Sequence, residues 1–217
     1  MTMHLAREIE KLKKRILTLG SEVEDVLQQS VQALDTMDGS LAATVAEGDN
    51  RIDTLEVDLE EECLKVLALY QPVANDLRFI ISVLKINNDL ERIADLAVNI
   101  SERVLDLLRH ERIPVPFQFS EMSGLVSDMV KKSLDSLVNL DQRQAREVIA
   151  LDDQVDALHH NSYGLVKDRI RKNPNHIEPL ICYLVVSRYL ERIADQATNI
   201  AEDVLYLIEG KIVRHTI

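Results

Sequence analysis

The chain is poor in the residues that form turns, cross-links and aromatic clusters. Its 217 residues contain no Trp, 4% aromatic residues, six Gly, five Pro and two Cys, whereas 46% are hydrophobic. A chain with few turn residues and many aliphatic ones is typical of long helices, so we expect an all-α fold with almost no sheet. Cys63 and Cys182 stand among apolar helical positions, which predicts buried free thiols rather than a disulfide or a metal clip.

Positive charge is scarce as well. The chain has 25 Lys and Arg against 37 Asp and Glu, a formal net charge of −12 at pH 7. Nucleic-acid binding requires a basic surface that releases counterions from the phosphates, so nucleic acids are excluded as partners. The one basic cluster, at 11–15, lies inside an amphipathic helical pattern and predicts a solvated helix face, not a membrane anchor.

Long hydrophobic runs are also missing. No apolar run approaches the roughly 18 residues of a membrane span, and the first residues have no apolar core of signal-peptide length. We therefore expect a soluble, cytoplasmic protein that meets a membrane only indirectly, through partners.

What the sequence does have is an internal repeat. The segment Leu-Glu-Arg-Ile-Ala-Asp at 90–95 recurs without change at 190–195, and several apolar residues after it match as well. Repeats of this kind indicate a duplicated structural unit. Because the copies lie 100 residues apart, the chain is predicted to form two similar halves that pack together.

Apolar residues recur at steps of three and four along most of the chain, which is the pattern of amphipathic helices. Pro72 and Pro174 interrupt this pattern, and Pro114 and Pro116 mark an extended linker at 113–116. We predict a first three-helix bundle in 1–112 and a second in 117–217, two tandem pseudo-symmetric units. The six long helices are expected at about 5–38, 41–70, 73–109, 117–140, 142–172 and 177–209.

Each half also carries two carboxylate pairs spaced by four residues. This spacing places both charges on one helix face, one turn apart, where they repel each other unless a cation compensates. Each pair borders the apolar stripe of its helix, so two neighbouring helices can bring four carboxylates into one groove. The first set is Asp49, Asp53, Glu91 and Asp95, and the second is Asp152, Asp156, Glu191 and Asp195.

Two equivalent acidic sites of this composition predict metal binding. Oxygen ligands without thiolate suit hard cations such as Mg²⁺, Mn²⁺, Ca²⁺ or ferric iron. Asn99 and Asn199, one turn further along, offer additional carbonyl oxygens. His159 stands where the first half has Glu56 and is an alternative ligand, but an ordinary packed or surface histidine is the favoured interpretation.

Two other interpretations stay open. In a chain this acidic, carboxylate pairs also arise by chance, as Glu56 with Glu60 illustrates, so the protein is alternatively a structural helical scaffold with surface charge. A ferritin-like carboxylate metalloenzyme requires Glu-x-x-His on two helices, and the sequence has none. Gly-rich phosphate loops, nucleophile–base pairs and redox Cys pairs are also missing, so we predict that the protein is not an enzyme.

Several segments together resemble the PhoU family of accessory proteins of phosphate-specific transport. They are 48–53, 71–78 and the two repeated hexapeptides followed by Asn99 and Asn199. The resemblance spans essentially the whole chain. The family commonly has Gly where Ala94 and Ala194 stand, a change without cost in a helix interior. Arg188 replaces the Asn88 of the first half, which predicts that the second site binds its cation differently or partly replaces it by a guanidinium.

The resemblance implies two three-helix bundles that bind metal ions, with Fe, Mn or Mg as the candidates, through the carboxylate motifs, and a homodimer. It also implies negative regulation of phosphate uptake and of the phosphate-starvation response. In this role the protein bridges the ATPase of the phosphate ABC transporter and a phosphate-sensing histidine kinase.

Overall fold

The computed structural model describes residues 3–48 and 50–211, and this part of the chain consists of helices and short connections without any strand. The predicted all-α fold class is confirmed. The helices are α1 (Met3–Thr36), α2 (Gly39–Glu47), α3 (Asn50–Tyr70), α4 (Ala74–Leu107), α5 (Phe119–Asn139), α6 (Gln142–Lys172), the 3₁₀ turn η1 (Pro174–His176) and α7 (Ile177–Glu209).

The helix predicted over 41–70 is wrong in one respect, because the structure divides it into α2 and α3. Gly48 caps the end of α2, and its N–H donates to the carbonyl oxygen of Val45. At the start of α2, the Asp38 carboxylate accepts from the N–H groups of Ser40 and Leu41, at 2.9 and 3.1 Å. Glycine is a poor helix former, and a helix end whose backbone groups are capped costs little free energy. A break at Gly48 is therefore only weakly unfavourable. The other predicted helices agree with the structure to within a few residues at each end.

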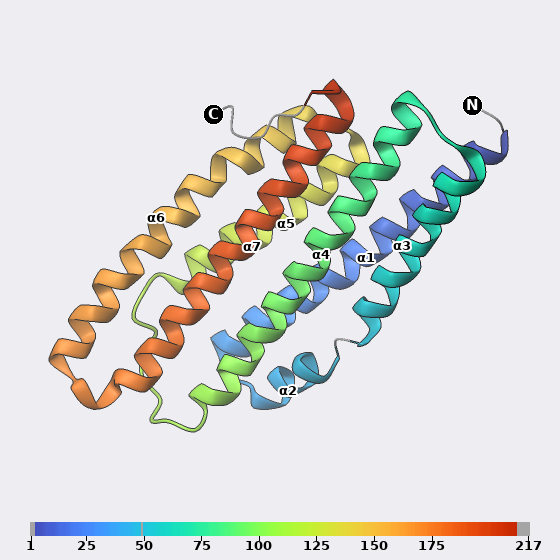
Figure 1. Cartoon of the computed structure of the whole chain (residues 1–217). Helices are drawn as coiled ribbons and strands as arrows, with labels where there is room; N and C mark the ends of the chain where they lie inside the picture. Colours follow the sequence, from blue (N-terminus) through green and yellow to red (C-terminus); the bar gives the residue numbers. More distant parts are fainter. Residues whose placement is uncertain (1–2, 49, 212–217) are drawn as a thin grey trace.

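The two helices that carry the repeat, α4 and α7, pack against each other at the centre of the molecule (Figure 1). α1, α2 and α3 lie on α4, while α5 and α6 lie on α7, and α1 also contacts α5. One continuous apolar core therefore runs through both halves. The repeated residues Leu90, Ile93, Leu190 and Ile193 are fully buried in it.

Close packing also determines where small residues stand. A side chain at Gly20 of α1 would bring its Cβ to 3.0 Å from Leu134 of α5, so the two helices approach closely there. Both cysteines are free, as predicted; Cys63 is buried as expected, whereas Cys182 is only half-buried. Burial raises the pKa of the Cys63 thiol to about 12 and that of Cys182 to about 11, so neither is a thiolate at neutral pH.

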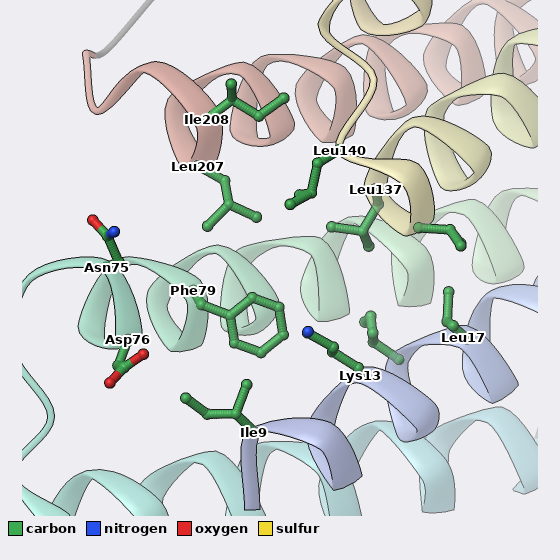
Figure 2. A pocket seen from close by; sticks show the side chains of 12 residues that line it. Ile9, Lys13, Leu17, Asn75, Asp76, Phe79, Leu137, Leu140, Leu207 and Ile208 are labelled. Carbon is green, nitrogen blue, oxygen red and sulfur yellow. The ribbon is translucent and has the colours of Figure 1, made fainter. Parts of the chain in front are cut away.

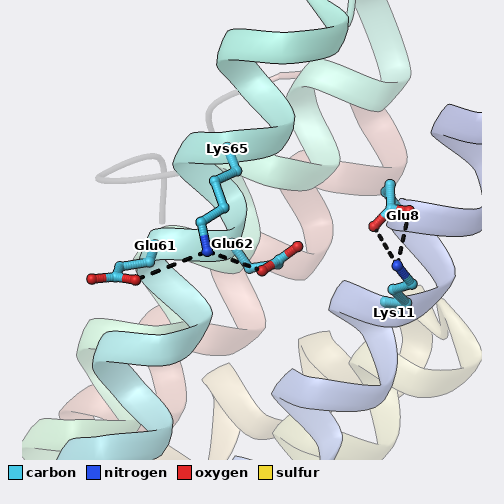
Figure 3. Close-up of polar contacts among 5 residues, drawn as sticks. All are labelled: Glu8, Lys11, Glu61, Glu62 and Lys65. Atoms are coloured by element: carbon cyan, nitrogen blue, oxygen red, sulfur yellow. Dashed lines mark hydrogen bonds and ion pairs between the residues drawn. The ribbon is translucent and has the colours of Figure 1, made fainter.

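The surface of α1 and α3 is covered by local ion pairs (Figure 3). Lys11 lies 2.8 Å from Glu8, and Lys65 lies 3.5 Å from Glu62. The basic residues of the run at 11–15 are exposed, which confirms the predicted solvated face. Across 3–48 and 50–211, none of the helices has an apolar stretch of the length and purity that spanning a bilayer requires.

Candidate metal centre

The first set of predicted ligands lies along the contact between α3 and α4. Burial raises the pKa of Asp95, and Asp53 of the neighbouring helix raises it further. Burial also raises the pKa of Glu91, followed by Asp95 and Glu56. Asp53, Glu91 and Asp95 therefore lie near enough for their charges to repel one another, and we refer to this part of the contact between α3 and α4 as the first groove. Asp49, the fourth predicted ligand, lies outside the described residues.

Glu56 belongs to the same groove, although the sequence did not single it out as a ligand. Its carboxylate Oε1 accepts a hydrogen bond of 2.9 Å from Nδ2 of Asn87 on α4, and its backbone carbonyl accepts from the same nitrogen at 3.1 Å. The signal that points to it is its spacing of three from Asp53, which keeps it on the same helix face. Glu56 therefore adds one further carboxylate to the two predicted pairs of the first site.

The second set lies along the contact between α6 and α7. Burial raises the pKa of Asp152 to about 6, and Asp195 and Asp156 contribute after it. Burial likewise raises the pKa of Asp195 to about 6, followed by Glu191 and Asp156. The four carboxylates therefore lie near enough for their charges to repel one another, and we refer to this part of the contact between α6 and α7 as the second groove.

His159 replaces Glu56 in this second groove and is packed against α7. It is 8% exposed, and its Nδ1 lies 3.0 Å from Oγ of Ser187. Burial lowers the pKa of the imidazole, and the Arg188 charge lowers it further. This confirms the interpretation of His159 as a packed histidine.

The carboxylates of the two grooves lack a basic partner in direct contact, whereas other acidic residues of the surface have one. Among the described residues, no Lys or Arg nitrogen lies within 4 Å of the seven predicted carboxylates, in contrast to Glu8 and Glu62 (Figure 3). Arg92 lowers the pKa of Glu91, and Arg192 and Arg188 lower that of Asp195, but only from a distance. Like charges in each groove are therefore left to repel one another.

The donor set fits a cation chemically. Each groove has a buried oxygen that accepts no hydrogen bond within the described chain, Oδ1 of Asn87 in the first and Oε2 of Glu191 in the second. Carboxylate and amide oxygens are the ligands that hard cations prefer. In the residues described, however, no three Asp, Glu, His or Cys side chains already converge on one point. Binding of an ion requires side-chain rotations that draw the carboxylates inward.

The raised pKa values predict how the stability of the metal-free protein depends on pH. Asp152 and Asp195 have pKa values of about 6 in the folded state, against roughly 4 when unfolded. The folded state therefore binds more protons between these values, and stability falls as pH rises from about 4 to 6. Asp195 is exposed, so solvent screens part of the repulsion. We therefore expect the free energy of unfolding to fall by only about 1–2 kcal/mol for Asp152 and Asp195 together.

Urea unfolding in the presence of a chelator, at pH 4.5 and 7, measures this loss. Asp195→Asn is the matched variant, because it removes one charge and should flatten the pH dependence relative to the parent. Titration of His159 is common to both proteins and cancels in the comparison. If the free energy of unfolding changed equally with pH in the parent and in the variant, the predicted repulsion would be contradicted.

A second hollow of the surface has a different character. It is an apolar pocket of about 350 Å³ at one end of the molecule, where residues of α1, α4, α5 and α7 meet (Figure 2). Phe79 lies at the centre of the pocket, and Nζ of Lys13 lies 5.8 Å from the centroid of its ring. Asp76 contributes a carboxylate to the lining. It lies about 18 Å along α4 from Glu91, so it is separate from the carboxylate grooves.

Comparison with known proteins supports the duplicated architecture. The PhoU domain family matches residues 16–104 and again 119–204. The chain is 38% identical to the phosphate-specific transport system accessory protein PhoU homolog of Aquifex aeolicus, over 98% of this chain and 96% of that protein. The crystal structure of PhoU from Pseudomonas aeruginosa superposes with a TM-score of 0.90 at 34% identity, covering 95% and 99% of the two chains. The phosphate transport system regulatory protein PhoU from Streptococcus pneumoniae superposes with 0.86 at 29% identity, covering 96% and 99%.

Proposed function

Because the chain belongs to the PhoU family, we propose that it is an accessory protein of phosphate-specific transport that negatively regulates phosphate uptake and the phosphate-starvation response. The observation that carries this proposal is the double family match over residues 16–104 and 119–204, with a cluster of carboxylates in each matched half. A relative with 34% identity and one with 29% identity have structures that superpose over almost their entire length.

The proposed partners are the ATPase of a phosphate ABC transporter and a phosphate-sensing histidine kinase, which the protein couples to each other. A role at the ATPase places the protein in the cytoplasm, associated with the membrane only through its partners. We propose a homodimer as the functional form. In this role the protein binds and positions other proteins and performs no catalysis.

We also propose that divalent or ferric metal ions, with Fe, Mn and Mg as the candidates, bind in the two grooves. A bound ion supplies positive charge between carboxylates that otherwise repel each other. Asp49, Asp53, Glu91 and Asp95 would hold one ion or cluster between α3 and α4. Asp152, Asp156, Glu191 and Asp195 would hold another between α6 and α7, so that each site ties a flanking helix to a central one.

Elemental analysis of protein purified without chelator or affinity-tag metal tests the sites. We expect bound metal in the parent. The variants Glu91→Gln/Asp95→Asn and Glu191→Gln/Asp195→Asn should each lose the metal of one site and keep that of the other. The matched control is Asp58→Asn/Glu62→Gln, an i,i+4 acidic pair on α3, which should leave the metal content unchanged. A parent that holds no metal, even after reloading, would make the carboxylates docking or salt-bridge residues.

A deletion strain tests the regulatory role. In phosphate-replete medium we expect constitutive expression of the phosphate-starvation phosphatase, and repression when the parent gene is restored. The Glu91→Gln/Asp95→Asn gene should restore repression only partly, whereas the Asp58→Asn/Glu62→Gln gene should restore it fully. Normal repression in the deletion strain would favour the structural scaffold.

A further inference from the structure

We propose that two copies of the chain associate through α3 of one copy and a basic, apolar hollow between α6 and α7 of the other, which we call the docking groove. This inference rests on the proposed homodimer and names the surfaces that form it. The contact joins two different surfaces, so a dimer is closed when α3 of each copy lies in the docking groove of the other. α3 and α6 lie on opposite sides of the molecule, so neither surface covers the other within one copy (Figure 1).

The docking groove has an apolar floor that leaves large side chains exposed. It lies closer to η1 than the second groove does, and its volume is about 630 Å³. Tyr163 of α6 is 47% exposed, and Ile181 of α7 is 44% exposed. A Cβ added at Gly164 would meet no atom within 4 Å, so another helix can approach α6 closely there. Exposed apolar side chains with a polar rim are typical of an interaction surface.

The rim of the docking groove is basic, although the protein is acidic. Lys167 and Arg171 line it, and no Asp or Glu of the described residues does. Residues 160–172 have four Lys and Arg against one Asp, in a chain of net charge −12. Arg171 lies 3.2 Å from that residue, Asp168, in an exposed ion pair of the kind that contributes little to stability.

Helix stability alone does not account for this charge. Basic residues in the last turn of a helix interact favourably with the helix dipole, and the last turn of α6 contains three of them. The effect is confined to that turn, whereas Lys167 lies five residues before the end of the helix. The docking groove therefore attracts an acidic surface that also carries apolar side chains.

α3 carries a surface of this kind. The helix has six Asp and Glu against two Lys and Arg. Val57 and Leu64 are 50% and 52% exposed, and they lie two turns apart on one side of the helix. Glu60 and Glu61 are exposed between them on the same side. We call these four residues the α3 ridge, and it complements the docking groove in both charge and polarity.

This complementarity arises from divergence within the repeat. In the register of the two carboxylate motifs, Glu60 and Glu61 of α3 correspond to Tyr163 and Gly164 of α6. An aromatic ring and open space thus stand where the other half has two acidic side chains. Each copy consequently offers an acidic ridge on one half and a basic groove on the other. Burial of the apolar side chains favours association, and the charges determine its orientation.

The test measures self-association of the full chain by sedimentation velocity, with a chelator present. Lys167→Glu/Arg171→Glu reverses the charge of the docking groove, and Glu60→Lys/Glu61→Lys reverses that of the α3 ridge. At low ionic strength, we expect each variant alone to have a dimer dissociation constant at least about tenfold higher than that of the parent. The reason is that like charges then face each other in both contacts of the dimer.

An equimolar mixture of the two variants should recover dimers of nearly parental affinity, because each ridge again faces a groove of opposite charge. All four substituted residues are exposed, so the fold should be kept, which circular dichroism verifies. Lys14→Glu/Lys131→Glu is the matched control. It reverses two exposed charges of α1 and α5 and changes the net charge as the groove variant does, but should alter the dissociation constant by less than about twofold.

The outcomes separate this inference from the proposed function. A parental dimer that neither variant weakens would overturn these surfaces and leave the homodimer standing. Weakened variants that do not recover dimers when mixed would overturn the direct contact between ridge and groove. A parent that stays monomeric at all concentrations would overturn the homodimer and, with it, this inference, whereas the regulatory role is decided separately by the deletion strain.

Discussion

Leu90→Ala and Leu190→Ala are each expected to lower the free energy of unfolding by about 3 kcal/mol. Both side chains are fully buried, and they occupy the same position in the two copies of the repeat. Truncation removes apolar surface from the core and leaves a cavity that rigid neighbouring helices fill only partly. The expected losses are similar because the surroundings repeat.

The same two variants also test whether the halves unfold together. α4 and α7 contact each other along the core, so a weakened packing in either half should destabilise the whole chain. Chemical unfolding followed by circular dichroism should show one transition that shifts in both variants. Leu69→Ala is the control, because Leu69 is 76% exposed and should change stability by less than about 0.5 kcal/mol. Two transitions, of which only one shifts, would show that the halves unfold independently.

Lys85→Met is expected to be the second most destabilising change, by about 2–3 kcal/mol. Nζ of Lys85 on α4 lies 2.9 Å from Oδ1 of Asp203 on α7, and the Asp203 side chain is only 3% exposed. Loss of the ammonium leaves a buried carboxylate with less compensation. Met keeps most of the aliphatic stem, so the change chiefly removes charge, including the approach of Nζ to the Tyr206 ring at 5.3 Å from its centroid.

Urea unfolding at pH 7 measures this effect, and two comparisons assign its cause. Lys11→Met removes a surface pair of similar length, 2.8 Å to Glu8, and should cost less than about 1 kcal/mol. Asp203→Asn added to Lys85→Met should recover part of the loss, because a neutral amide is cheaper to bury than a carboxylate. Equal losses for Lys11→Met and Lys85→Met would contradict the importance of burial.

The bridge between Lys85 and Asp203 also breaks the symmetry of the repeat. The equivalent positions are occupied by Val185 and Arg103, so the second copy of this contact does not exist. Arg103 pairs instead with Asp106 at 2.9 Å, within its own helix. A polar link thus joins α4 to α7 on one side of the pseudo-symmetric pair.

Hydrophobic periodicity predicted the helices well because a long helix must bury one continuous stripe. The residues Leu5, Ile9, Leu12 and Ile16 are all buried in α1, as their spacing required. The prediction for 41–70 was wrong because the apolar spacing passes through Gly48 without a visible interruption. The break depends on Gly48, which caps the C-terminal end of α2, and this is a choice of local backbone geometry.

By itself, the sequence determined the all-α class, the duplication and the pairing of carboxylates on single helix faces. These properties follow from the period of one helix, and that period is the same whatever the helix packs against. Only the tertiary structure decided which helices face each other across each groove. It therefore decided that Glu56 lies beside the first set of carboxylates, that His159 packs against Ser187 of α7, and that Lys85 meets Asp203, 118 positions away. Such contacts depend on how rigid helices dock, and no spacing within a single helix contains that information.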